Sequence, residues 1–186
     1  VLFRSGKSKS LGNFYMDFTR ALTRVLIPGA FILAIILIAT GVPQTLQGMI
    51  TIKTIEGTFQ NIAMGPIAAL EAIKFLGTNG GGFFAANSAT PFADPNLISN
   101  FIEMLAMTVI PGAFIVSFGM TIKNKKQSIV IIIALLVLVL ISFFVMYYGN
   151  SLGNTLLQNL GLSKQLSGST GQDLRFGNFG TSLFTT

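Results

Sequence analysis

Six consecutive residues carry the strongest chemical signal in this sequence: Thr78-Asn79-Gly80-Gly81-Gly82-Phe83. Three consecutive glycines let the backbone adopt either sign of φ at little steric cost. A loop of this kind can turn successive carbonyl oxygens toward one axis, where they replace the water around a cation. The segment therefore predicts a cation-binding loop that uses backbone oxygens, to which Thr78 could add its hydroxyl.

The same glycines also fit a dinucleotide-binding fingerprint, because Gly80, Gly82 and Ala85 have the required spacing. That fingerprint needs a strand before it and a helix after it. Here an apolar segment of helical pattern precedes the glycines, which disfavours a nucleotide site. The sequence also lacks a Gly-Lys-Ser/Thr phosphate loop. We therefore expect no ATP site on this chain.

The composition is that of a membrane protein. The 186 residues are 51% hydrophobic and only 10% charged, and the mean hydropathy is +0.71. About a quarter of the residues are charged in ordinary soluble domains. Because the sequence has no cysteine and no histidine, disulfides, thiolate metal sites and imidazole chemistry are excluded. We expect no catalytic residues.

Three uncharged runs, 25–42, 104–122 and 129–148, approach or reach the length of a transmembrane helix, which is about 20 residues. A wholly buried helical bundle is disfavoured by that length. Basic residues precede the first run and separate the second from the third. Residues 1–24 and 123–128 are therefore predicted to be cytoplasmic, because basic loops stay on that side. The first helix then runs outward, the second inward and the third outward.

The segment between the first two spans predicts a re-entrant pore loop. Residues 43–61 form an outer loop, in which 51–58 alternate roughly in polarity and could form a short strand or an extended loop. Residues 62–76 have a helical pattern but would cross only about half of the ~30 Å hydrocarbon core. The C-terminal end of this half-helix carries partial negative charge, which favours a cation in the loop that follows. Residues 77–100 then form the filter loop and its ascent.

Charged and aromatic residues near this loop are expected to have structural roles. Glu71 is a candidate functional carboxylate, but we favour a structural pair with Lys74, three residues later on the same helix face. Glu103 is predicted to lie at the membrane interface. Phe83 and Phe84 are expected to pack the loop against neighbouring helices.

The chain from about Leu11 to Thr186 resembles the potassium-binding (A) subunit of the Kdp-type potassium-transporting ATPase. Phe75-Leu76-Gly77-Thr78-Asn79-Gly80-Gly81-Gly82-Phe83-Phe84 is similar to the second of the four pore loops of that family. Flanking segments follow in the same order: Leu11-Gly12-Asn13-Phe14, Gly41-Val42-Pro43-Gln44, Met64-Gly65-Pro66, Glu71-Ala72-Ile73-Lys74, Asn100-Phe101 and Arg175-Phe176-Gly177. By this comparison the chain is roughly the middle third of a full subunit.

The resemblance implies an all-α membrane protein with a potassium-channel-like pore helix and filter. Thr78, Asn79, Gly80, Gly81, Gly82 and Phe83 would bind potassium through their backbone carbonyls. A separate P-type subunit would hydrolyse ATP, with small accessory subunits in the same complex, in a prokaryotic inner membrane. Residues 149–174 would form an outer loop and 175–186 the start of the next pore helix. The alternatives are a passive channel or secondary potassium transporter with similar loops, and a non-transporting membrane anchor.

Overall fold

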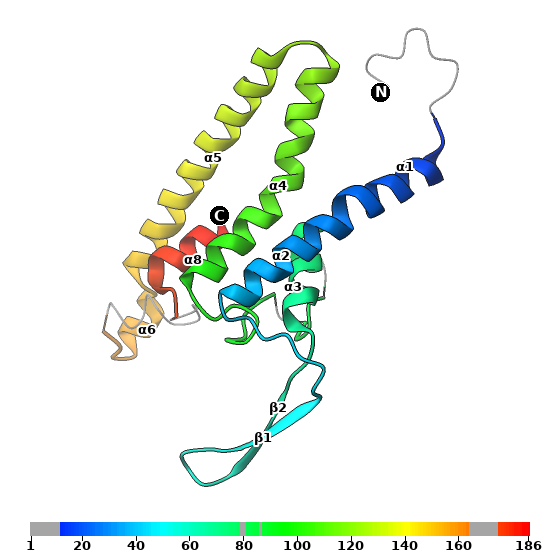
Figure 1. The fold of residues 1–186 in the computed structure, drawn as a ribbon. Coiled ribbons are helices and arrows are strands. Elements are labelled where there is room, and N and C mark those ends of the chain that lie inside the picture. The colour runs from blue at the N-terminus through cyan, green and yellow to red at the C-terminus, as the bar shows by residue number, and fades with distance from the viewer. Residues whose placement is uncertain (1–11, 79–80, 86, 164–174) are drawn as a thin grey trace. The chain divides into compact units, whose positions relative to one another are not determined.

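The computed structural model describes residues 12–78, 81–85, 87–163 and 175–186. The chain divides into two compact units, one formed by Gly12–Ile110 and the other containing Pro111–Thr186. The division falls inside helix α4 (Leu97–Thr121), and Figure 1 shows the elements of each unit. The described residues are mostly helical, which confirms the predicted fold class.

One continuous helix opens the first unit. It is made of α1 (Phe14–Ala21), the π-helical turn η2 (Leu22–Leu26) and α2 (Ile27–Ala39). The side chain of Asn13 caps its start, where Oδ1 accepts a hydrogen bond from the N–H of Tyr15 at 3.0 Å. Pro28 has no N–H to donate to the preceding turn, and the wider π-helical turn ends just before it. The helix ends at Ala39 because Gly41 adopts a left-handed φ of +102°.

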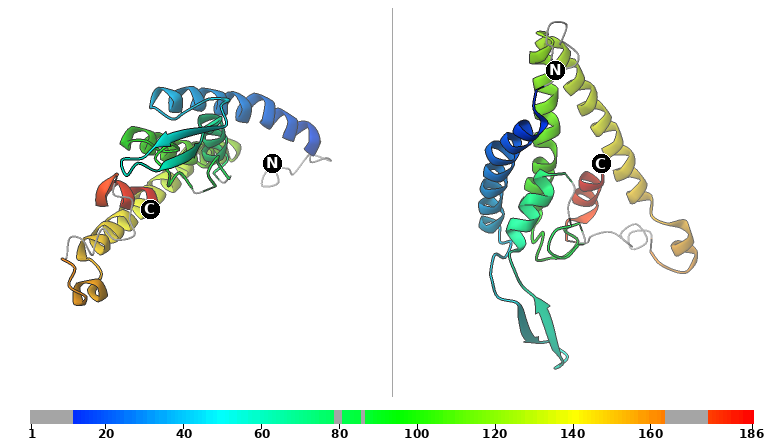
Figure 2. Two further views of the ribbon diagram at one scale, coloured as in Figure 1. Left: turned by 90° about the horizontal axis from the view of Figure 1, so that it is seen from below. Right: turned by 90° about the vertical axis from the view of Figure 1, so that its right-hand side faces the viewer.

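A β-hairpin follows, made of β1 (Met49–Lys53) and β2 (Phe59–Ala63). The strands are antiparallel, with Met49 opposite Ala63 and Lys53 opposite Phe59. Figures 1 and 2 show the hairpin projecting away from α2 and α3. The predicted strand is confirmed only for 51–53, because residues 54–58 form the turn.

The half-helix α3 spans Ile67–Leu76. The prediction of a helix from residue 62 was wrong by five residues, because β2 continues to Ala63 and pairs with β1. Two groups outside the helix satisfy its first N–H donors. The carbonyl of Pro43 accepts from Ala68 at 3.1 Å, and Gln44 Oε1 accepts from Ala69 at 3.0 Å. The chain before the hairpin therefore fixes where α3 begins.

Helices α2 and α3 pack against each other and form much of the buried apolar core of this unit. Gly29 of α2 makes the approach possible, since a Cβ built there would lie 2.9 Å from Leu76 Cδ2. Asn96, beyond the loop, donates from Nδ2 to the carbonyl of Thr40 at 2.6 Å. The buried apolar residues are Leu33, Ala34, Leu37, Val42, Ile67, Ala68, Ala72, Phe75, Leu76, Ala93 and Ala106.

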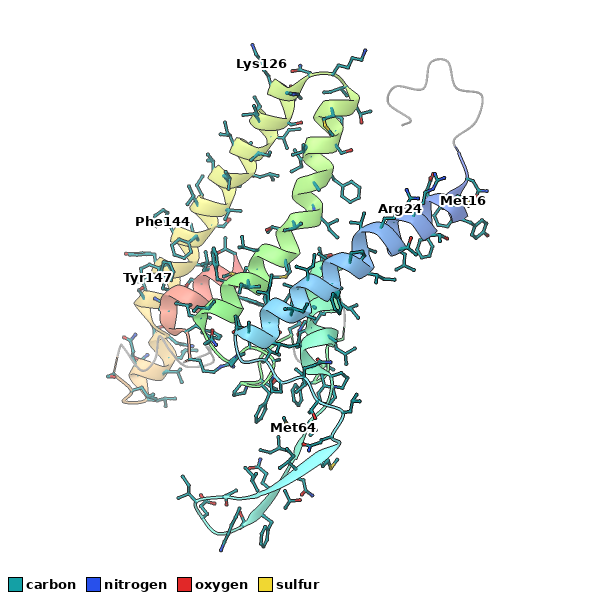
Figure 3. All side chains as sticks on the ribbon, in the orientation of Figure 1. Met16, Arg24, Met64, Lys126, Phe144 and Tyr147 are labelled. Atoms are coloured by element: carbon teal, nitrogen blue, oxygen red, sulfur yellow. The ribbon has the colours of Figure 1, made fainter. Side chains whose placement is uncertain are left out.

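In the second unit, the end of α4 turns sharply into α5 (Lys125–Leu152). Asn124 caps α5, accepting from the N–H of Gln127 at 3.3 Å, and Ser128 Oγ donates to the carbonyl of Ile115 at 2.8 Å. Figure 3 shows Lys126 beside this turn. Gly119 leaves room for Ser128, because a Cβ at Gly119 would overlap the Ser128 side chain.

Two short helices follow, α6 (Thr155–Asn159) and α8 (Gly177–Thr185). Helix α8 packs on α5: Asn178 Nδ2 donates to Ser151 Oγ at 2.8 Å, and the rings of Phe143 and Phe179 meet edge to face with centroids 5.4 Å apart. Asn178 Nδ2 also donates to the carbonyl of Tyr147 at 3.3 Å, a residue that Figure 3 marks on α5 beside Phe144. Helix α8 lies within 175–186, where a helix was expected to begin; its role as a pore helix stays a prediction.

Three helices of the described chain are long and apolar enough to cross a membrane: Phe14–Ala39, Leu97–Thr121 and Lys125–Asn159. The predicted spans 25–42, 104–122 and 129–148 overlap these helices, whose ends differ from the predicted bounds. Asparagine caps and polar end turns extend the first and third helices beyond their apolar runs. Residues 14–24 are therefore helical, and α5 continues to Leu152, inside the predicted loop 149–174. The second helix likewise begins earlier, at Leu97, and the first stops three residues short of Val42.

Substituting Gly119→Ala is expected to destabilise the hairpin of α4 and α5, because the new methyl group would overlap Ser128. Overpacking of this kind costs about 1–3 kcal/mol. The measurement is the thermal unfolding midpoint of the purified protein. Gly112→Ala is the matched control on the same helix, since no described atom lies within 4 Å of its added Cβ. Equal midpoints for the two variants would contradict the packing.

Candidate ion-binding loop

The loop begins with a sharp reversal at the end of α3. Gly77 caps the helix, and the N–H of Thr78 donates to the carbonyl of Phe75 at 3.1 Å. Thr78 then adopts a left-handed φ of +64°, and Gly82 a φ of +60°. The predicted ligands Asn79 and Gly80 lie outside the described residues. The C-terminal end of α3 therefore stands at the start of the loop, as predicted.

The described part of the loop has one open side and one packed side. Thr78 and Gly81 are exposed, and no described atom lies within 4 Å of a Cβ built on Gly81. Gly82 differs, because a Cβ there would lie 2.5 Å from Glu71 Oε1 and 3.2 Å from Lys74 Nζ. The backbone at Gly82 thus rests directly on α3, where only glycine fits.

Aromatic rings hold the C-terminal side of the loop. A Cβ on Gly65 would overlap the ring of Phe83, so that ring lies against the backbone just before α3. Phe83 and Phe84 meet edge to face at 4.9 Å between centroids, and Phe84 lies 6.2 Å from Phe92. These contacts support the prediction that both phenylalanines pack the loop.

A buried ion pair lies behind Gly82. Glu71 and Lys74 are in contact, as their spacing predicted, and their side chains are only 1% and 4% exposed. Ser88 joins them: Lys74 Nζ donates to Ser88 Oγ at 2.8 Å, and Ser88 Oγ donates to Glu71 Oε2 at 2.9 Å. Ser88 could not be identified from the sequence, because a lone serine in a loop carries no signal of its own.

The structure buries Glu103 completely. Its position at the membrane interface stays a prediction. Its carboxyl group lies close to Ser88, and Asp94, Glu71 and Lys74 are the charged groups that act on it. Asp94 accepts a hydrogen bond from Ser99 Oγ. The start of α4 therefore turns a polar face toward the cluster behind the loop.

Side-chain ligands for a multivalent metal do not gather in the part of the chain that the structure describes. It contains no group of three or more His, Cys, Asp or Glu residues that could hold such an ion. Backbone carbonyls are the alternative ligands, and they suit a monovalent cation because they are neutral dipoles. Thr78 and Gly81 are the exposed residues of the described part of the loop.

A family model described as KdpA, potassium-transporting ATPase A subunit, matches residues 2–186. The chain belongs to this family. The family is the potassium-binding subunit of the Kdp potassium-uptake ATPase, and it functions in a complex with other subunits. The resemblance inferred from the glycine loop and its flanking segments is thereby confirmed, as is potassium transport by a membrane protein. The passive channel, the secondary transporter and the membrane anchor are not favoured.

Substituting Gly65→Ala is expected to displace the ring of Phe83 and so disturb the C-terminal side of the loop. The strain should cost about 1–3 kcal/mol, measured as a lower thermal unfolding midpoint of the whole complex. Gly48→Ala is the control, because no described atom lies within 4 Å of its Cβ. Phe83→Leu in the Gly65→Ala background should restore part of the loss. An unchanged midpoint for Gly65→Ala would show that the ring is not held there.

Proposed function

We propose that residues 78–83 form one quarter of the potassium filter, with the backbone carbonyls of Thr78, Asn79, Gly80, Gly81, Gly82 and Phe83 as ligands. The observation that supports this most directly is the contrast between Gly81, whose surroundings are open, and Gly82, which is packed on α3. A loop anchored on one side keeps its other side free for an ion and holds its oxygens in place.

The length of α3 supports a re-entrant path for this segment. Its 10 residues extend about 15 Å at 1.5 Å per residue, which is half of the hydrocarbon core. Irregular backbone at that depth is tolerated only where protein buries it or where it lines a wet cavity. The partial negative charge at the end of α3 favours a cation at Thr78.

The distribution of basic residues supports a multi-pass topology in a prokaryotic inner membrane. Residues 1–24 and the turn around Lys123, Lys125 and Lys126 would face the cytoplasm. The first span then runs outward, the second inward and the third outward. Tyr147 and Tyr148 lie near the end of α5 and would mark the outer interface, where tyrosine is enriched.

Energy for transport would come from a partner. The sequence has no phosphate-binding loop, and we infer that ATP is bound and hydrolysed by a P-type subunit, with small accessory subunits in the same complex. This chain would contribute selection and binding of potassium. Its residues would carry no covalent step of the ATPase reaction.

Replacing Gly81 with aspartate tests the filter. No described atom blocks a side chain at Gly81, so Gly81→Asp should leave assembly intact and place a carboxylate among neutral carbonyl dipoles. We expect the potassium concentration for half-maximal ATPase activation of the complex to change by about tenfold or more, equivalent to about 1.4 kcal/mol. Discrimination between potassium and rubidium should also fall.

Gly48→Asp provides the matched control, because its Cβ also meets no described atom within 4 Å but it lies in the loop before β1. This variant should activate normally. Normal potassium activation and selectivity in an assembled Gly81→Asp complex would rule out the filter assignment, and would indicate that the glycine loop serves only packing.

A further inference from the structure

The ion pair of Glu71 and Lys74 is placed where it can act on the filter loop. Both side chains come from α3, and both would contact a Cβ on Gly82. An ordinary side chain at Gly82 would therefore collide with the pair. The positive φ of Gly82 also favours glycine there. The loop backbone and the charged pair thus form one packed unit.

Ser88 extends this unit to the far side of the loop. It lies six residues after Gly82, and its hydroxyl bonds both members of the pair. Ser88 is 6% exposed and holds a φ of +61°, a conformation that costs energy for a residue with a Cβ. The surrounding contacts sustain that conformation, so the bridge fixes the return limb of the loop relative to α3.

Stability alone does not explain these charges. Burying two ions in a low-dielectric interior costs more than their attraction usually returns, and apolar residues of similar size often serve as well. Additional polar groups increase the cost here, since Glu103 is fully buried and the amide of Asn100 has no hydrogen-bond partner among the described residues. Charged residues at membrane depth are in general functional.

We propose that Glu71, Lys74 and Ser88 are positioning residues for ion selectivity, a role that rests on the proposed filter. The pair supports the backbone at Gly82, and Ser88 joins the two limbs of the loop. Together they fix the spacing of the carbonyl oxygens that face the ion. A filter held this way distinguishes potassium from rubidium because its oxygens do not relax to fit the larger ion.

The test replaces both charges with apolar side chains in the intact complex. Glu71→Leu combined with Lys74→Met removes both members of the pair together, so neither is left buried without its partner, and the complex should assemble. We expect the potassium concentration for half-maximal ATPase activation to rise by about tenfold and the ratio of rubidium to potassium constants to fall toward one. A purely structural pair would change thermal stability but not this ratio.

Asp17 and Arg20 provide a matched control, because they form an ion pair with the same i,i+3 spacing on α1 at 3.8 Å but are exposed. Asp17→Asn with Arg20→Gln should leave both activation constants unchanged. Potassium and rubidium constants within about twofold of the wild type in an assembled Glu71→Leu/Lys74→Met complex would overturn the proposal.

Ser88→Ala is a second variant that tests the same proposal if the double variant does not assemble. Ser88→Ala retains both charges and removes only the bridging hydroxyl, so it should assemble and lower the rubidium-to-potassium ratio by a smaller amount. An unchanged ratio in Ser88→Ala would then overturn the proposal. If Gly81→Asp alters potassium activation while the pair variants do not, the filter stands and only the positioning role fails.

Discussion

Hydrogen-bonding groups of the backbone cannot be left unpaired in lipid, and this constraint governs the whole structure. The described segments that would lie in the membrane are helical except around the glycine loop. There α3 ends after 10 residues, and the chain enters a series of left-handed conformations at Thr78, Gly82, Ala85, Asn87 and Ser88. Such a loop needs partners for its carbonyls, and a cation can provide them. Contacts of the loop with α3 and with aromatic rings hold this non-helical segment in place.

The sequence allowed the main elements to be predicted, because the signals for them are local. The spans follow from hydropathy, the half-helix from its apolar period and the loop from its glycines. Their bounds could not be predicted as well. The predicted half-helix included residues 62–66, since the pattern there does not show that 59–63 pair with 49–53 in a hairpin. The caps at Asn13 and Asn124 similarly extend helices past the apolar runs.

The candidate site was predicted in outline but not in its supporting contacts. The three-residue spacing of Glu71 and Lys74 predicted that they pair. Their burial and their proximity to Gly82 could not be predicted, because both depend on how the loop folds back onto α3. The burial of Glu103 was not predicted either, because in the sequence it lies at the edge of an apolar run, whereas the folded protein covers it completely. Long-range contacts such as Ser88 with Glu71 require the tertiary structure.

We propose that peptide oxygens of residues 78–83 bind potassium. The most direct measurement is the position of the ion in a crystal of the intact complex, found from anomalous diffraction near the potassium absorption edge. We expect a potassium peak coordinated by carbonyl oxygens of Thr78 through Phe83, on the side of the loop away from Glu71. A bound potassium that touches none of these oxygens, or that is held by side-chain carboxylates instead, would contradict it.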